Sequence, residues 1–138
     1  MTVADASLPL QKAIVARLKT DAAMIALVAG RVYDNVPPGA TKPYVSVGPF
    51  DALTISADEY EGSETTLQFD GWAPGPESTQ VKQLGRAMRA ALHEADLALD
   101  ENQRLQFLVV DAVRYLLEPD GMTQHAVVTL RARTEPSA

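Results

Sequence analysis

The chain has two histidines, the side chains most versatile for acid–base catalysis and metal binding, and neither has a second ligand at metal-binding spacing. His93 is expected on the polar side of a helix near its end, and His125 at the start of the last strand. Transition-metal sites need several His, Cys or carboxylate ligands at short, regular spacings. We therefore interpret both histidines as surface residues and predict no metal site.

Nucleophilic catalysis is equally unsupported. The chain has no cysteine, which excludes disulfides, thiolate metal sites, iron–sulfur clusters and cysteine nucleophiles. No serine lies in a G-x-S-x-G turn, so a triad of Ser46, Ser56, Ser63 or Ser78 with a histidine would rest on availability alone. The glycines do not form a dinucleotide- or phosphate-binding loop. The sequence therefore predicts neither an enzyme nor a cofactor.

Carboxylates gather in residues 51–64, a segment that we call the acidic flap. It contains five acidic residues and neither lysine nor arginine: Asp51, Asp58, Glu59, Glu61 and Glu64. Nothing apolar surrounds the Glu59 and Glu61 pair to raise a pKa, as a general acid requires. We interpret the flap as an exposed, partly mobile loop, and a surface for assembly into a polymer is the alternative.

Composition points to one soluble domain over residues 1–138, with flexible ends at residues 1–6 and 135–138. Eighteen acidic residues against twelve basic ones leave a formal charge of −6, which argues against tight binding of nucleic acid. The chain has no apolar run long enough to span a membrane and no signal-peptide pattern at its start. We therefore expect no membrane partner.

Three helices are predicted from apolar spacing. Leu10, Ile14 and Leu18 form one stripe of a helix over residues 7–19, with Ser7 as N-cap. A short helix over residues 22–29 ends at Gly30, and a longer one follows Ser78 to residue 94. Gly85 lies inside this last helix, where it costs about 1 kcal/mol relative to alanine, so we expect close packing against a sheet there.

Strands are predicted over residues 31–36, 44–47 and 65–73, the second ending at Gly48 and Pro49. Residues 104–118 and 124–134 are predicted to form a hairpin around the Pro-Asp-Gly turn of residues 119–121. Tyr33 and Trp72 are interpreted as covering the edge of the core. The predicted fold class is α+β: a two-layer sandwich whose antiparallel sheet has about four or five strands, with two or three helices on one face.

Several of these segments resemble a known family when taken in order. They are GRVYDNVPPGATKPYVSVG, FDGWA before the last helix, and the closing hairpin YLLEPDGMTQHAVVTLRARTE. Over residues 10–134 the chain resembles the tail-completion, or tail-terminator, proteins of long-tailed bacteriophages and gene transfer agents, a family formerly catalogued as a domain of unknown function. The quoted residues mark the fold, so the resemblance brings no catalytic residue with it.

The resemblance implies a structural protein of the virion tail, assembled in the host bacterial cytoplasm. Its subunits would form a homo-hexameric ring that caps the tail tube protein and joins the head–tail connector or stopper protein, while DNA passes through the lumen without tight binding. Because the apolar helix stripes are committed to the core, loops and sheet edges remain for assembly. The interface candidates are Pro37, Pro38, Lys42, Asp58, Glu59, Glu61, Asp120 and Gly121.

Other functions remain open from the residues alone. Two-layer α+β domains also serve as small-ligand-binding regulatory modules, and a fold does not decide between functions. Another minor head–tail connector or tail subunit would have a similar composition, and an orphan hydrolase is a third alternative.

Overall fold

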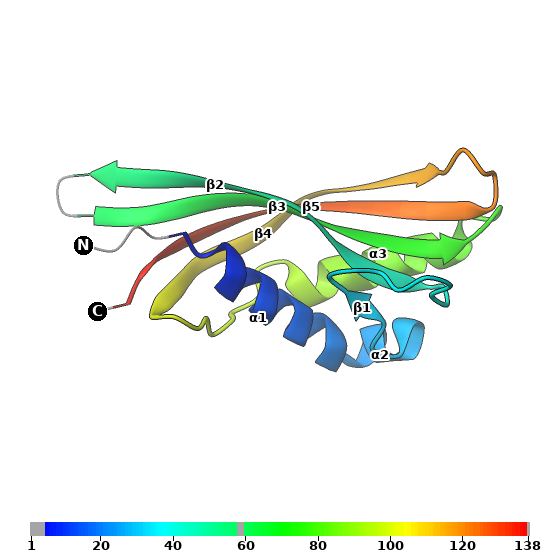
Figure 1. The fold of residues 1–138 in the computed structure, drawn as a ribbon, viewed down its shortest axis with the longest axis horizontal. Coiled ribbons are helices and arrows are strands. Elements are labelled where there is room, and N and C mark those ends of the chain that lie inside the picture. Colours follow the sequence, from blue (N-terminus) through cyan, green and yellow to red (C-terminus); the bar gives the residue numbers. More distant parts are fainter. Residues whose placement is uncertain (1–4, 58–59, 138) are drawn as a thin grey trace.

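In the part of the chain that the structure describes, five strands form one sheet, and three helices cover one of its faces (Figure 1). The structure is a computed structural model that describes residues 5–57 and 60–137. In chain order the elements are α1 (Ser7–Thr20), α2 (Ala22–Val28), β1 (Val32–Tyr33), β2 (Tyr44–Ala57), β3 (Tyr60–Pro74), α3 (Thr79–Leu92), β4 (Gln103–Leu117) and β5 (Thr123–Pro136). The predicted two-layer α+β sandwich is confirmed.

The sheet has the order β1-β2-β3-β5-β4. Four strands are antiparallel, as predicted, but β1 runs parallel to β2, with Val32 opposite Val45. The direction of a strand depends on the path of the loop before it, and the loop of residues 34–43 carries the chain back to the same end of the sheet. Local sequence patterns do not contain that information.

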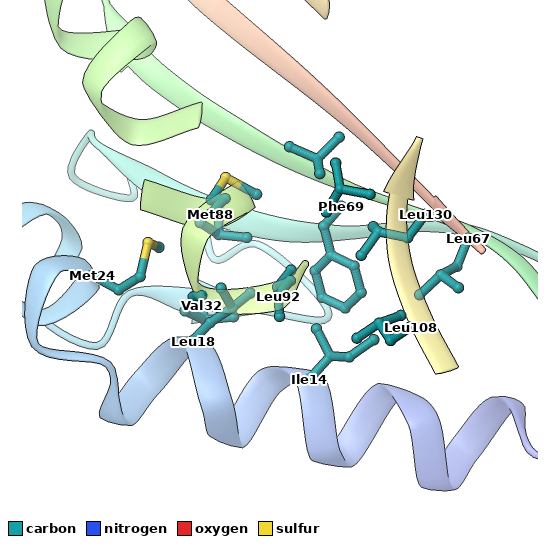
Figure 2. Close-up of a cluster of buried hydrophobic side chains, with 14 of the residues drawn as sticks. Ile14, Leu18, Met24, Val32, Leu67, Phe69, Met88, Leu92, Leu108 and Leu130 are labelled. Carbon is teal, nitrogen blue, oxygen red and sulfur yellow. The ribbon is translucent and has the colours of Figure 1, made fainter. Parts of the chain in front are cut away.

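The core lies between the helices and the sheet. The predicted stripe of α1 is fully buried, and Figure 2 shows Ile14 close to Phe69 and Leu108. On β5 the expected alternation holds, because every second side chain from Ala126 to Ala132 is buried against the helices. Each buried leucine, isoleucine or phenylalanine contributes about 1.5–3 kcal/mol relative to an exposed one.

Helix α3 can lie close to the sheet because Gly85 has no side chain. A Cβ atom added at Gly85 would lie 2.7 Å from Cε1 of Tyr115 on β4, and closer still to the tyrosine hydroxyl. The expected compensation for a glycine inside this helix is therefore confirmed.

The prediction that β2 ends at Gly48 and Pro49 is wrong. These two residues oppose the single residue Gln68 in a β-bulge between Val47 and Phe50, and β2 then continues to Ala57. Proline is tolerated at a bulge because the extra residue needs no ladder hydrogen bond. Pairing with β3 therefore outweighs the local preference of Gly-Pro for ending a strand.

The acidic flap is correspondingly not a loop. Residues 51–57 pair with residues 60–66, from Asp51 opposite Thr66 to Ala57 opposite Tyr60. We call residues 51–57 and 60–64 the acidic arm, because in Figure 1 this hairpin continues past the helices at one end of the sheet. Asp58 and Glu59 lie outside the described residues.

Several element ends also differ from the predictions. The N-cap of α1 is Ala6 rather than Ser7, and α3 ends at Leu92 rather than residue 94. Ala6 is fully buried, β5 continues to Pro136, and the Ser137 N–H donates to the Asn102 carbonyl at 2.7 Å. The structure thus gives packing or backbone contacts to Ala6, Pro136 and Ser137, which lie in the ends that the sequence predicts to be flexible. No helix within the described ranges is long and apolar enough to cross a membrane.

Candidate functional site

Most of the interface candidates lie together at the end of the sheet opposite to the acidic arm. We call the loop of residues 34–43 and the turn of residues 118–122 the loop end. Pro37, Pro38, Lys42 and Asp120 are all exposed there. Lys42 lies close enough to Asp120 for its positive charge to act on the carboxylate. The structure thus brings together residues that lie about eighty positions apart in the chain.

The Pro-Asp-Gly turn is organised by the side chain of Asp120. Its Oδ1 accepts the N–H groups of Met122 at 2.8 Å and Thr123 at 2.9 Å, and its Oδ2 accepts the Thr123 hydroxyl at 2.8 Å. These bonds, that from the Met122 N–H most of all, hold the pKa of Asp120 below its ordinary value, and Lys42 adds to the effect. Gly121 has a φ of 68°. The hairpin tip is therefore an ordered surface.

The remaining candidates belong to the other end of the sheet. Glu61 is half-buried on β3, and Asp58 and Glu59 fall outside the described part of the chain. Because β3 has 15 residues, about 45 Å separate its two ends. One subunit therefore offers two separate surfaces rather than one site.

The acidic arm is partly neutralised by arginines that the sequence pattern did not associate with it. Glu64 lies 2.7 Å from Arg133 and 3.8 Å from Arg131, both on β5. The hydrogen-bonded carboxylate of Asp111 raises the pKa of Arg131. Asp51 and Leu53 on β2 stay exposed, with Leu53 at 68%.

A polar and aromatic cluster on the open face of the sheet was missed from the sequence. His125 Nε2 lies 2.7 Å from Asp70 Oδ1, and its Nδ1 lies 3.7 Å from Glu118. The imidazole stacks on Trp72 with 3.8 Å between centroids, and the Trp72 indole N–H donates to Ser46 Oγ at 2.9 Å. Only 12% of the His125 side chain is exposed, so its interpretation as a surface residue is wrong.

Tyr33 and Trp72 extend this cluster into a row across the sheet. The ring centroids of Tyr33 and Tyr44 are 5.7 Å apart, and those of Tyr44 and Trp72 are 6.4 Å apart. Because Val45 and Gly71 face the helices, their neighbours Tyr44 and Trp72 face away from the helix layer. Trp72 therefore lies on the open face of the sheet, opposite to the face that packs against the helices.

The contacts of this cluster are suited to stabilising the sheet rather than to catalysis. Ser46 Oγ accepts the indole N–H of Trp72, and no hydrogen bond joins it to His125 among the described residues. His93 caps α3, and its Nδ1 accepts the Val110 N–H at 3.0 Å. Within residues 5–57 and 60–137, no group of three or more His, Cys, Asp or Glu side chains could hold a metal ion.

Comparison with known proteins extends over nearly the whole chain. Residues 12–135 match the family model described as tail completion protein gp17. A chain in the solved structure of the virion of a native gene transfer agent particle is similar, with 30% sequence identity and a TM-score of 0.86. The similarity covers 95% of the present chain and 98% of that chain. No curated protein matches the sequence.

Proposed function

Because this chain belongs to the tail completion protein gp17 family and is a structural protein of the virion tail, we propose that it caps the tail tube as a hexameric ring. The similarity to a chain of a gene transfer agent virion, at a TM-score of 0.86 over 98% of that chain, carries this proposal. The ring would end the growth of the tube and join it to the head connector.

Free strand edges support assembly into a ring. β1 pairs only with Val45 and Ser46, so within the described residues the rest of β2 has no partner on that side. At the opposite edge of the sheet, residues 93–98 already bond to the first half of β4, at Arg104, Leu108 and Val110, so within the described residues only its second half lacks a partner on that side. Unpaired strand edges are ready templates for another chain. Because these two edges differ, contact between them is head-to-tail, and such contacts close into rings when the rotation allows.

The remaining contacts of the ring belong to the two ends of the subunit, the loop end and the acidic arm. We assign the loop end, with Pro37, Pro38, Lys42, Asp120 and Gly121, to contact with the tail tube or the head connector. Its exposure and its ordered turn support this assignment.

The acidic arm and its tip, with Asp58, Glu59 and Glu61, then belong to the ring itself, at a subunit contact or at the lumen. Carboxylates facing the lumen would repel DNA phosphates, so that DNA passes without tight binding.

The direct test is removal of the gene from a cell that produces the particles. Tails without the ring should have irregular lengths and remain separate from heads in electron micrographs. A plasmid copy of the gene should restore complete particles, in which a six-fold ring is visible at the head-proximal end of the tail. Tails of normal length joined to heads in the deletion strain would contradict the proposal.

A further inference from the structure

The helix layer carries a one-sided charge. Its three helices contain six basic residues and no Asp or Glu, although acidic residues outnumber basic ones eighteen to twelve in the whole chain. All six side chains are exposed: Lys12, Arg17, Lys19, Lys82, Arg86 and Arg89. Half of the positive charge of an acidic protein therefore lies on the exposed side of the helix layer, which we call the basic face.

These six cations also lack ionic partners among the residues that the structure describes. Three of the four arginines on the strands, by contrast, are paired: Arg104 with Glu135, Arg131 with Asp111 and Arg133 with Glu64. Uncompensated charge on one face favours binding of an oppositely charged surface.

A groove between α2 and α3 lies within this basic face. It has a volume of about 590 Å³, and small side chains make most of its lining, including Ala23, Ala26 and Ala90. Arg86 and Gln83 also line it. The groove therefore combines an apolar floor with a positive charge beside it.

The acidic arm has the complementary character. Its Leu53 has 68% of its surface exposed, more than Leu8, Ile25, Leu117 or Met122, the other exposed large apolar side chains that the structure describes. Asp51 lies two residues away, so its side chain is on the same face of β2. The sequence of residues 51–64 contributes five negative charges and no positive one, and Arg131 and Arg133 of β5 pair with one of the five, Glu64, so that Asp51 keeps its charge for a partner.

We propose that the acidic arm of one subunit docks on the helix layer of a second copy, with Leu53 in the groove between α2 and α3 and Asp51 against Arg86. The inference rests on the proposed ring. Figure 1 shows the acidic arm at one end of the sheet and α2 towards the other, so the arm does not reach the groove of its own subunit. The contact is head-to-tail, the type that closes into rings.

Duplex DNA is the alternative occupant of the basic face. Phosphates require clustered Lys and Arg but leave an apolar groove unfilled, and the groove floor is made of alanines. Leu53 with Asp51 beside it suits both features of this face, because the leucine would fill the apolar groove and the aspartate would pair with the positive charge next to it. The structure therefore favours a second copy over DNA.

Cross-linking tests the contact directly, because the chain has no cysteine of its own. Particles are produced with the double variant Leu53→Cys/Ala90→Cys and oxidised. Denaturing gels without reductant should show a ladder from dimers to hexamers, and either single variant should show none. Particles that assemble normally but give no ladder would overturn the inference, while the proposed function would still stand on the deletion experiment.

Charge exchange tests the pairing. Arg86→Glu should reduce the number of complete particles about tenfold, and adding Asp51→Lys should restore them, which also shows that the variant folds. The matched control is Lys12→Glu, at a basic residue of α1 beside a different cavity, and it should assemble normally. Normal assembly of Arg86→Glu would overturn the pairing. If Arg86→Glu assembled normally but lost affinity for duplex DNA, the basic face of the helix layer would be assigned to nucleic acid.

Discussion

The imidazole of His125 lies flat against the indole of Trp72, with 3.8 Å between ring centroids and 13° between planes. The stack joins β5 to β3 on the face that no helix covers. It also holds His125 Nε2 at 2.7 Å from Asp70, whose side chain is only 9% exposed. His125 thus both stacks on Trp72 and binds the buried carboxylate of Asp70.

We predict that His125→Ala lowers the free energy of unfolding by about 1–3 kcal/mol, because it leaves the Asp70 carboxylate with fewer hydrogen-bond partners. Urea unfolding followed by Trp72 fluorescence measures the change. Thr129→Ala, on the same face of β5, removes only a long hydrogen bond of 3.4 Å and should change stability by less than about 0.5 kcal/mol. Equal effects of the two variants would contradict a structural role for the cluster.

Gly85→Ala should destabilise the protein although alanine favours helices. The added Cβ meets Tyr115, and overpacking of this kind costs about 1–3 kcal/mol, against a gain of about 1 kcal/mol in helix propensity. Ala90→Gly at an exposed position of α3 measures propensity alone and should cost about 1 kcal/mol. If Gly85→Ala were the more stable protein in urea, the close approach of α3 to β4 would not matter.

The hairpin tip should respond to acid. The pKa of Asp120 is lower in the folded protein than in the unfolded chain, so its contribution to stability is present above its ordinary value of 3.8 and is lost as the pH falls through the lowered value. In an NMR titration, the amide signals of Met122 and Thr123 should move with a midpoint below 3.8. The same transition should be missing in Asp120→Asn. A midpoint at or above 3.8 would show that the turn does not stabilise the carboxylate.

Reversing the charge of the arm tip should separate folding from assembly. We expect the triple variant Asp58→Lys/Glu59→Lys/Glu61→Lys to fold with a free energy of unfolding within about 1 kcal/mol of the original, because the sequence predicts these charges to be solvated, and solvated charges contribute little. If the tip contacts a neighbouring subunit, complete particles are lost. If it faces the lumen, particles form but deliver less DNA.

The matched control is a second triple reversal at exposed acids that follow α3, Glu94→Lys/Asp96→Lys/Glu101→Lys. It should leave both particle number and DNA delivery unchanged. Normal particles with normal delivery from the arm-tip variant would remove the tip from the proposed function.

The elements that the sequence predicted well are those whose faces are sorted by burial. Leu10, Ile14 and Leu18 repeat at the helical period because one face of α1 is buried, and β5 alternates because one face of its strand is. Both signals are local, and both were confirmed. The parallel direction of β1 was missed because it depends on where the loop of residues 34–43 leads.

The polar cluster of Asp70, Trp72 and His125 could not be predicted from the sequence for a different reason. Asp70 and Trp72 are two residues apart, so the sequence alone places them on one face of a strand. That His125 lies beside them depends on the register in which β3 pairs with β5, with Trp72 opposite His125. That register is fixed by the whole sheet, including the bulges in β2 and β4, and no short segment encodes it.

The bulge at Gly48 acts as a joint between the core and the arm. A Cβ atom added at Gly48 would lie 2.7 Å from the Gln68 carbonyl oxygen and 2.9 Å from Asp70 Oδ2, so β2 can approach β3 this closely only without a side chain here. Bulges bend a strand and increase its twist. The bulge therefore helps to set the angle at which the arm leaves the subunit, and with it the diameter of any ring that the arm helps to close.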